Sequence, residues 1–568
     1  MIINIAHNIF EICFIFIYFT FFGITIHKLI SKGNTQFPDL IQLNLLGLFA
    51  NYLLLALWNI FFPINIFLGL ILIITGIPFI YYSINRVQIK KIIVKLKPIH
   101  FLLSLIQIIF MLWIANRSLG LLKYEPMYYI QKIRWAQEYP LIKGLGNLFD
   151  HFGLDSSHFL YLALLDSFPF IFWSFWNFSG YLLALGFLYF FVMPLFDIYN
   201  KKRSPSISNI MKLLFTPILV HNSFYMHPGL GTDLPVFIFG SILAVEMFRI
   251  FFEGEESLNI VFICIILGFT SKMSFIPTAI LSIIAFALFY YRNIGNIIRK
   301  NILMILLVVI GLSLQIHRNI ILTGYPLYPF ERISVPVKWK MDKEEVGNLS
   351  KSISNWAKGI RHGNTSGNLE RIKKEWLKSR LLLQHRRVET LYPLVLAFFG
   401  FVFIVFSKKL NWKNLCIFIL PVLGQLGMWY FHAPDTRFSS FAFWWIGAGL
   451  GSFAIKKMIP KKWMVVLPLG IVIFSFSIHA IDFMGQKKSL FVSHPSYFIP
   501  KCPPATQFEI DSGLKVWIPE NGAKCDDCPL PCTQVPPSLL KLRTEGKING
   551  GFLMNYSKPN SIINKPTQ

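Results

Sequence analysis

Two carboxylates in one polar stretch, Glu125 and Asp155 of residues 124–158, are the first candidates for catalysis. The stretch interrupts a mostly apolar chain, and it also carries aromatic residues and a Gly-Leu-Gly turn. A carboxylate at the boundary between membrane and water can have a raised pKa and act as a general base on a hydroxyl group. Alternatively, these acids cap helices, since Asp155 precedes two serines, and the aromatic residues form an interfacial belt.

Three charged residues at the ends of apolar runs are further candidates: Asp233 for catalysis, and Lys272 and Arg318 for binding a substrate. Acids at a membrane boundary are costly and therefore often functional, although Asp233 also suits a helix cap. Lys272 follows an apolar run of 14 residues, 258–271, which is short for a bilayer. We therefore expect its ammonium group to bind a phosphate, to pair with an acid such as Asp233, or to extend to the lipid headgroups.

A long basic loop, residues 321–391, follows Arg318 and contains 14 Lys or Arg against 7 Asp or Glu. Arg361 and several tryptophans, including Trp356, lie in it. Arginine chelates phosphate and indoles stack on sugar faces, so the loop suits an anionic lipid-linked substrate or a sugar. The alternative is a solvated amphipathic helix on anionic headgroups, which residues 370–387 resemble.

Four of the seven cysteines cluster in the polar C-terminal region: Cys502, Cys525, Cys528 and Cys532. This clustering predicts an oxidising compartment and one or two disulfides, with three possible full pairings. A Cys-x-x-Cys pair can also bind metal, but the proline-rich setting and the isolated Cys502 do not match a metal site. The acids and histidines of 150–158 also lack a strong metal-binding spacing, so we predict no cofactor and no metal.

Composition identifies the chain as a polytopic membrane protein. Of its 568 residues 54% are hydrophobic and only 14% are charged, which excludes a soluble multidomain enzyme. The net charge of +26 could indicate nucleic-acid binding, but the basic residues form short clusters between apolar runs, as orientation signals do. We predict an all-α fold of about 13–15 transmembrane helices, surrounded by membrane lipids and without a nucleic-acid partner.

The basic clusters orient these helices, because cytoplasmic loops carry an excess of Lys and Arg. All the clusters face the cytoplasm if the N-terminus is outside and fourteen segments each cross once, which also places the C-terminus outside. The N-terminus lacks a basic leading region and a cleavage site, so we expect its apolar run to be retained. The predicted spans are 9–27, 41–61, 64–82, 99–116, 177–197, 210–226, 235–252, 258–271, 274–291, 302–320, 392–407, 413–431, 439–455 and 464–482.

Residues 157–175 are also apolar enough to span, but a crossing there would move every later basic loop outside. We therefore predict a re-entrant or interfacial segment, which Asp166 and Pro169 in its middle favour. The alternative is that residues 157–175 do cross the membrane, and that a second crossing, which the pattern misses, restores the orientation of the later loops.

Three polar regions then face outside, and they define the predicted domains. The outside regions are 117–156, 321–391 and 483–568. The predicted domains are the N-terminal transmembrane helices 1–98, a transmembrane core 99–482 and an extracytoplasmic, disulfide-stabilised region 483–568.

Seven sequence blocks together resemble an uncharacterised family of bacterial multi-pass membrane proteins. They run in order from about residue 120 to the end, whereas 1–98 resembles the family only in hydropathy. The blocks are YYIQKIRWAQEYPLIKGLGNL with DSSHF (128–159), TDLPV (232–236), SKMS (271–274), RNIILTGYPLYP (318–329), ISNWAK (353–358), DTRF (435–438) and CDDCPLPC (525–532).

The family in turn looks like the GT-C class of polytopic glycosyltransferases, in which an acid in an early outside loop is the base and the donor is a polyprenyl-phosphate sugar. The resemblance implies Glu125 as the base, Asp233 as a second acid, and Lys272 and Arg318 as phosphate binders. The chain departs from the expected pattern at Tyr129, where we expect a histidine, and one position before Glu125, where we expect an aspartate.

We therefore predict a membrane glycosyltransferase at the outer face of the bacterial cytoplasmic membrane, using a polyprenyl-phosphate-linked sugar. Asp155 is the alternative base, and Tyr129 and Arg361 are further substrate-binding candidates. The alternatives are a transporter or flippase of lipid-linked saccharides, and a polysaccharide polymerase or ligase. A transporter would carry its functional charges within the spans, with Glu246 lining a central cavity.

Overall fold

The structure is a computed structural model of the 568-residue chain. Two predicted site residues, Glu125 and Arg361, lie outside the residues that it describes. The described residues are 2–30, 38–86, 98–117, 128–169, 177–200, 205–225, 230–255, 258–358, 387–407, 411–460, 466, 468, 470–477, 501–509, 513–520, 524–534, 540–544 and 546–554.

Apolar helices dominate the described chain, and they make it a helical membrane protein. Six are long and apolar enough to cross a bilayer: α1 (Ile2–Ile30), α2 (Leu40–Phe61), α8 (Asn177–Phe187) continued through π-helix 188–192 into α9 (Met193–Asn200), α12 (Asp233–Phe248) continued through π-helix 249–253, α15 (Ile294–Thr323) and α19 (Trp412–Phe431). Other apolar helices include α3 (Ile66–Arg86), α5 (Pro98–Arg117), α13 (Leu258–Ser271), α14 (Ile276–Phe289), α18 (Leu391–Ser407) and α20 (Ser440–Met458). The predicted membrane class and helical fold are therefore confirmed, and the number of crossings remains a prediction.

The predicted span 210–226 is not one continuous helix. It is divided at Phe215 into α10 (Ile207–Leu214) and α11 (Thr216–Tyr225). Pro217 has no N–H group to donate to the carbonyl of Leu213, so the α-helical pattern cannot run unbroken through this point. The apolar run is therefore helical as predicted, but Pro217, two residues beyond the break, divides it into two helices.

Helix α7 (Ser157–Asp166) occupies the first part of the predicted re-entrant segment. Its ten residues extend about 15 Å, which is about half of the hydrocarbon core. The side chain of Ser156 caps it by accepting from the N–H of His158, at 3.1 Å. A buried helix of this length suits the predicted re-entrant segment, although residues 170–176 lie outside the described chain.

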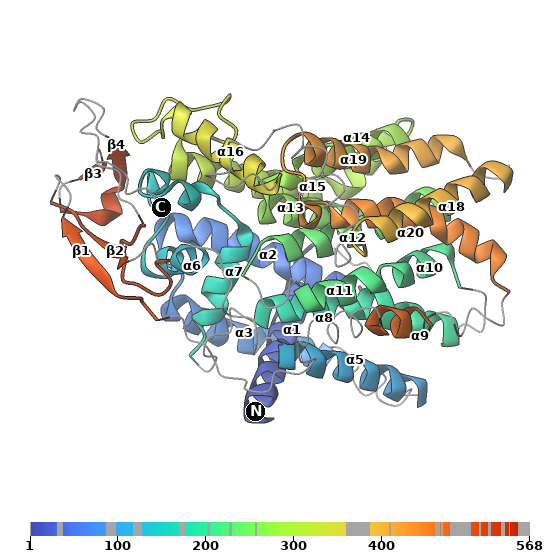
Figure 1. Ribbon diagram of the computed structural model, residues 1–568. Helices are drawn as coiled ribbons and strands as arrows, with labels where there is room; N and C mark the ends of the chain where they lie inside the picture. Colours follow the sequence, from blue (N-terminus) through green and yellow to red (C-terminus); the bar gives the residue numbers. More distant parts are fainter. Residues whose placement is uncertain are drawn as a thin grey trace.

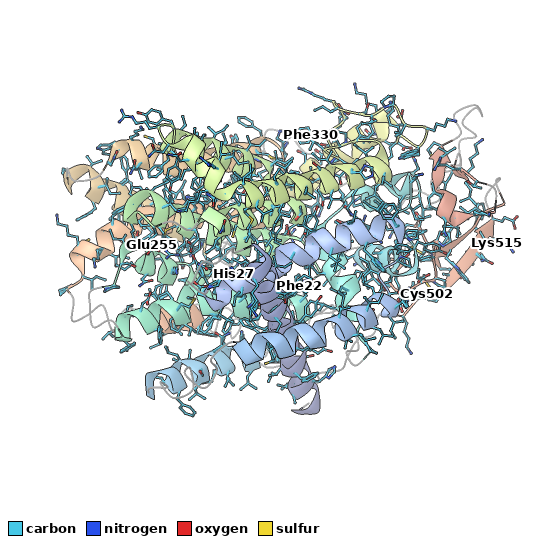
Figure 2. All side chains as sticks on the ribbon, turned by 180° about the vertical axis from the view of Figure 1, so that it is seen from behind. Phe22, His27, Glu255, Phe330, Cys502 and Lys515 are labelled. Atoms are coloured by element: carbon cyan, nitrogen blue, oxygen red, sulfur yellow. A yellow bond between two sulfur atoms is a disulfide. The ribbon has the colours of Figure 1, made fainter. Side chains whose placement is uncertain are left out.

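The described parts of the three regions predicted to be outside pack together, and we call this assembly the polar cap (residues 128–156, 321–358 and 501–554). It contains α6 (Tyr129–Glu138), α16 (Lys343–Ala357), β1 (Ala505–Glu509), β2 (Lys515–Pro519), β3 (Leu540–Leu542) and β4 (Phe552–Met554). In Figure 1 the strands and α6 lie at the left end of the molecule, whereas α9, α10 and α18 extend toward the other end. Figure 2 likewise places Cys502 and Lys515 at the end opposite Glu255.

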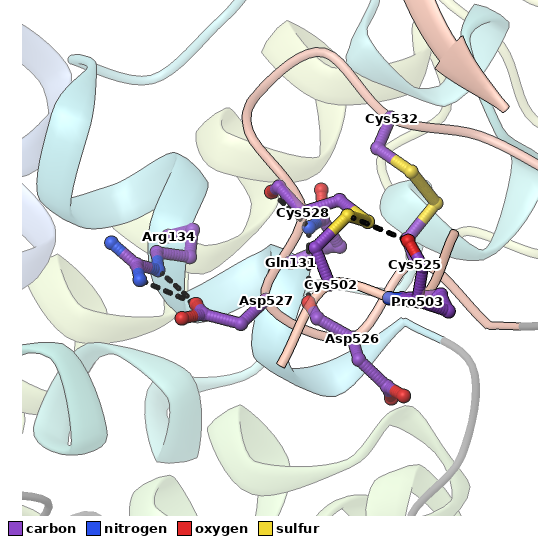
Figure 3. Close-up of a disulfide and its surroundings, with 9 residues drawn as sticks. All are labelled: Gln131, Arg134, Cys502, Pro503, Cys525, Asp526, Asp527, Cys528 and Cys532. Atoms are coloured by element: carbon purple, nitrogen blue, oxygen red, sulfur yellow. Dashed lines mark hydrogen bonds and ion pairs between the residues drawn. A yellow bond between two sulfur atoms is a disulfide. The ribbon is translucent and has the colours of Figure 1, made fainter. Parts of the chain in front are cut away.

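The C-terminal part of the cap consists of two antiparallel strand pairs, β1–β2 and β3–β4. Disulfides join Cys502 to Cys528 and Cys525 to Cys532, which is one of the three possible pairings. Figure 3 shows how α6 holds the loop between them. The side-chain amide of Gln131 donates to the carbonyls of Asp526 and Cys528, and Arg134 forms an ion pair with Asp527.

An apolar interface completes the cap. Trp135 of α6 packs edge-to-face on Phe552 of β4, with ring centroids 6.1 Å apart. Val516 of β2 and Leu322 at the end of α15 are buried in the same cluster. The C-terminal part of the cap therefore covers α6 and the end of α15.

Two glycines set the close crossing of α1 and α2. A Cβ atom at Gly47 would lie 2.0 Å from the backbone oxygen of Phe19, and one at Gly23 would lie 1.9 Å from that of Leu43. Because both neighbours are backbone atoms, the helices would have to move apart, as is typical of small-residue contacts between membrane helices.

We expect Gly47→Ala to lower the free energy of unfolding by about 1–3 kcal/mol, the usual cost of overpacking. Chemical unfolding in mixed micelles measures this change. Gly427→Ala is the matched control, because nothing lies within 4 Å of its added Cβ in α19. The control should be neutral or stabilising, since alanine favours helix more than glycine does, and an equal loss in both variants would contradict the proposed close contact.

Candidate functional site

A buried ion pair between Asp155 and Arg318 lies where the polar cap meets the apolar helices. The Arg318 guanidinium donates twice to this carboxylate, from Nε at 2.8 Å and from Nη2 at 3.2 Å. Its Nη1 donates to the side-chain oxygen of Asn59 at 3.2 Å, and Gln315 donates to Asp155 at 3.2 Å. The two charged side chains are only 3% and 2% exposed, so they neutralise each other away from water.

A third charge, Lys132 of α6, joins this pair. Its Nζ donates to the backbone carbonyl of Phe152 at 2.7 Å and lies 3.9 Å from Asp155 Oδ1. Burial lowers the pKa of Lys132 to about 8, and the nearby Arg318 adds to this effect, while Asp155 opposes it. Burial alone would raise the pKa of Asp155, but Arg318 and Lys132 outweigh it and the pKa is lowered.

These three charges face a small cavity of about 20 Å³ beneath the polar cap. That volume holds about one water molecule. Its polar lining consists of Asn59, Lys132, Asp155 and Arg318 together with Trp135. The rest of the lining is apolar: Ala136, Pro140, Leu141, Ile142, Leu145, Phe159, Leu160 and Leu322.

A second charged cluster is more accessible and consists of Asp233, Lys272 and Arg437. Lys272 forms an ion pair with Asp233, and the two side chains are 28% and 18% exposed. Arg437 follows Asp435, to which its Nε donates at 3.3 Å. Burial alone would lower the pKa of Arg437, but the carboxylates of Asp233 and Asp435 raise it above its usual value. The cluster therefore brings two cations, Lys272 and Arg437, beside the Asp233 carboxylate where α12, α13 and the α19–α20 turn meet.

Aromatic side chains surround this second cluster. The Lys272 ammonium lies 3.8 Å from the ring centroid of Phe438, and the Arg437 guanidinium lies 5.0 Å from that of Trp356. Trp356 is 54% exposed and belongs to α16 of the polar cap. Tyr129 lies close to Gly231, two residues before Asp233. Cations with exposed aromatic faces suit a ligand that carries both a phosphate and a sugar.

The two clusters are coupled through their neighbours in the chain. Ser156, next to Asp155, donates to the backbone carbonyl of Ser271 at 2.7 Å, and Ser271 precedes Lys272. On the other side of Lys272, Met273 accepts a weak contact from Asn319, the residue after Arg318. The residues on both sides of Lys272 therefore contact residues adjacent to the two members of the buried pair.

The structure divides the predicted site residues into two groups. Asp233 and Lys272 meet, which is one of the alternatives that the sequence left open, and Arg318 meets Asp155 instead. Tyr129 lies beside the first group, while Glu125 and Arg361 are outside the described residues. The sequence prediction missed the roles of Lys132 and Arg437. The DTRF block contained Arg437, but nothing in its spacing indicated a partner 204 residues earlier (437 minus 233).

Glu246 lies elsewhere in α12 and is fully buried. It accepts hydrogen bonds from Tyr189 and from Arg249, whose Nη1 is 2.7 Å away. Glu246 is not among the residues that line the cavity described above. These contacts are structural: an ion pair with Arg249, in the π-helical turn 249–253, and a hydrogen bond from Tyr189, in the π-helical turn 188–192.

Within the described part of the chain, no group of three His, Cys, Asp or Glu side chains is placed to hold a metal ion.

Fold and site together define a helical membrane protein with an accessible charged and aromatic cluster beside a disulfide-linked polar cap. The chain belongs to the family described as a domain of unknown function (DUF8201), which matches residues 6–444. Searches of curated proteins and of solved structures gave no match. The matched range includes the N-terminal helices and ends before the C-terminal cysteines.

Proposed function

We propose that the protein is a membrane glycosyltransferase that takes its sugar from a polyprenyl-phosphate donor at the outer face of a bacterial cytoplasmic membrane. The observation that carries the proposal is the cluster of Asp233, Lys272 and Arg437 beside the exposed Trp356. The GT-C resemblance of the sequence blocks supplies the reaction class, which is an argument by analogy.

In this proposal the acceptor hydroxyl attacks the anomeric carbon of the donor sugar. A new carbon–oxygen bond forms as the bond to the phosphate breaks, and the lipid phosphate leaves as an anion. Lys272 and Arg437 stabilise the charge that develops on this leaving group, because both are cations at the same accessible site. Asp233 is the partly exposed carboxylate of this cluster, so it can take the acceptor proton, and Glu125 is the second candidate.

Asp155 and Arg318 receive a different role from the one that the sequence prediction gave them. A carboxylate with a lowered pKa and a two-point ion pair is a poor base. The Arg318 guanidinium is likewise occupied by Asp155 and Asn59. We propose that this pair positions the backbone on both sides of Lys272.

The position of the charges favours a transferase over a transporter or flippase. The accessible cluster adjoins the polar cap, and Glu246 is engaged by Tyr189 and Arg249. A transporter would need accessible charges along a path between the spans. A polysaccharide polymerase or ligase would use the same kind of lipid-linked donor. It would differ from the proposed enzyme only in the acceptor to which the sugar is transferred.

We expect Lys272→Met and Arg437→Met each to reduce sugar transfer by about 100-fold, the usual effect of removing one group that stabilises developing charge. The assay uses the full chain in micelles with a panel of polyprenyl-phosphate hexoses and measures release of polyprenyl phosphate. Lys338→Met, an exposed lysine of the polar cap, is the matched control and should keep wild-type activity. Unchanged release in both cluster variants, or no release from any donor of the panel, would contradict the proposal.

A further inference from the structure

The buried cluster of Lys132, Asp155 and Arg318 carries an unbalanced charge. Two cations and one carboxylate leave a net charge of +1, and each of the three residues is at least nine-tenths buried. Of the described residues that line the adjacent cavity, Asp155 is the sole acid. Burying an uncompensated charge costs several kcal/mol, so either the charge is removed or a counter-ion accompanies it.

Hydrogen-bond donors without partners belong to two residues that line the same cavity, Lys132 and Trp135. Trp135 is 3% exposed and lines it, and the indole N–H has no hydrogen-bond partner among the described residues. Lys132 has three N–H donors, of which one is used by the carbonyl of Phe152. A buried donor that is left unpaired costs about 1–3 kcal/mol. These remaining donors therefore have no acceptor among the described residues, and Asp155 balances one of the two positive charges.

We propose that this cavity binds one small monovalent anion of the size of chloride, held by Lys132, Trp135 and Arg318. An anion there supplies both missing elements, because it neutralises the excess charge and accepts from the ammonium and indole groups. The cavity of about 20 Å³ suits a ligand of about the size of one water molecule, such as a halide, better than a phosphate group. The inference is independent of the proposed transferase reaction.

The ionisation of Lys132 makes the binding pH-dependent. The charged groups that face its ammonium are Asp155, from the loop before α7, and Arg318, from α15. Without an anion the pKa of Lys132 falls from 10.5 to about 8, so stability rises with pH between these values as the buried charge is lost. A bound anion favours the charged form of Lys132. The stabilisation by the anion is therefore greatest below about pH 8, and it disappears above pH 10.5, the unperturbed pKa of the lysine.

Thermal unfolding of the full chain in micelles tests the site, with sodium gluconate replaced stepwise by sodium chloride at constant total salt. We expect a saturable rise in Tm with chloride and with bromide, but none with phosphate, because only a ligand of the native state shifts Tm in this way. The rise should be present near neutral pH and lost at pH values above about 10. Chloride NMR line broadening provides a second measurement that does not depend on stability.

Two variants identify the residues that bind the anion. Lys132→Met should abolish the chloride response and, in gluconate, unfold at or above the wild-type Tm, because it removes the excess charge. Trp135→Phe should weaken chloride binding about tenfold, the loss expected for one hydrogen bond to an ion. Lys338→Met is the control and should respond as the wild type does. Absence of any rise, a rise that both site variants retain, or an equal rise with phosphate would overturn the proposal.

Discussion

Replacing Asp155 by asparagine is expected to lower the free energy of unfolding by about 3–5 kcal/mol, the cost of breaking a buried ion pair from one side. The asparagine keeps the shape of the side chain but leaves Lys132 and Arg318 as two buried cations with no carboxylate between them. Arg318→Met should cost less, because Lys132 and Asp155 remain as a neutral pair. The expected order of destabilisation is therefore Asp155→Asn, then Arg318→Met, then Lys132→Met.

Unfolding in mixed micelles at a fixed chloride concentration measures this order. The double variant Lys132→Met/Asp155→Asn should be more stable than Asp155→Asn alone, because it removes one of the two repelling cations. Asp342→Asn is the matched control, since Asp342 caps α16 by accepting from the N–H of Glu344 and asparagine caps equally well. If Asp155→Asn were as mild as this control, the buried cluster would not contribute to stability as described.

The apolar helices could be predicted from the sequence because each crossing must satisfy its own backbone. Runs such as 41–61 and 413–431 therefore appear as α2 and α19 with ends within a residue or two of the prediction. The pairing of Lys272 with Asp233 could be offered as an alternative for a related reason, since the two residues flank apolar runs on the same predicted side of the membrane. The break at Phe215 cannot be predicted from hydropathy alone, because it depends on the effect of Pro217 on the preceding turn.

The buried cluster could not be predicted, because its members are far apart in the chain and show no local pattern. Asp155 and Arg318 are separated by 163 residues. Lys132 lies in α6 between Gln131 and Ile133, and nothing in this local pattern distinguishes a buried lysine from an exposed one. The cysteine pairing was similarly open, since the spacing of four cysteines allows three arrangements and only the folded chain selects one.

The second large effect is expected at the disulfides, because the C-terminal part of the cap has little other core of its own. Cys525, Cys528 and Cys532 form one of its buried clusters, with Trp517 packed against them. We expect Cys525→Ala/Cys532→Ala to cost this part of the cap about 2–5 kcal/mol, as is usual for a native disulfide in a small unit. Limited trypsin digestion should then cut at residues such as Lys515 and Lys524, while the apolar helices stay intact.

The consequence should reach the buried cluster, because α6 holds the loop between the disulfides. Once Gln131 and Arg134 lose their contacts with residues 525–528, Trp135 loses the cover of Phe552 and the cavity beneath opens to water. The chloride response should therefore weaken together with the resistance to trypsin. Cys416→Ser, at an exposed free cysteine, is the control and should change neither. Cleavage without any loss of the chloride response would show that the cap does not close the cavity, and an unchanged digestion pattern would show that the disulfide does not hold the cap.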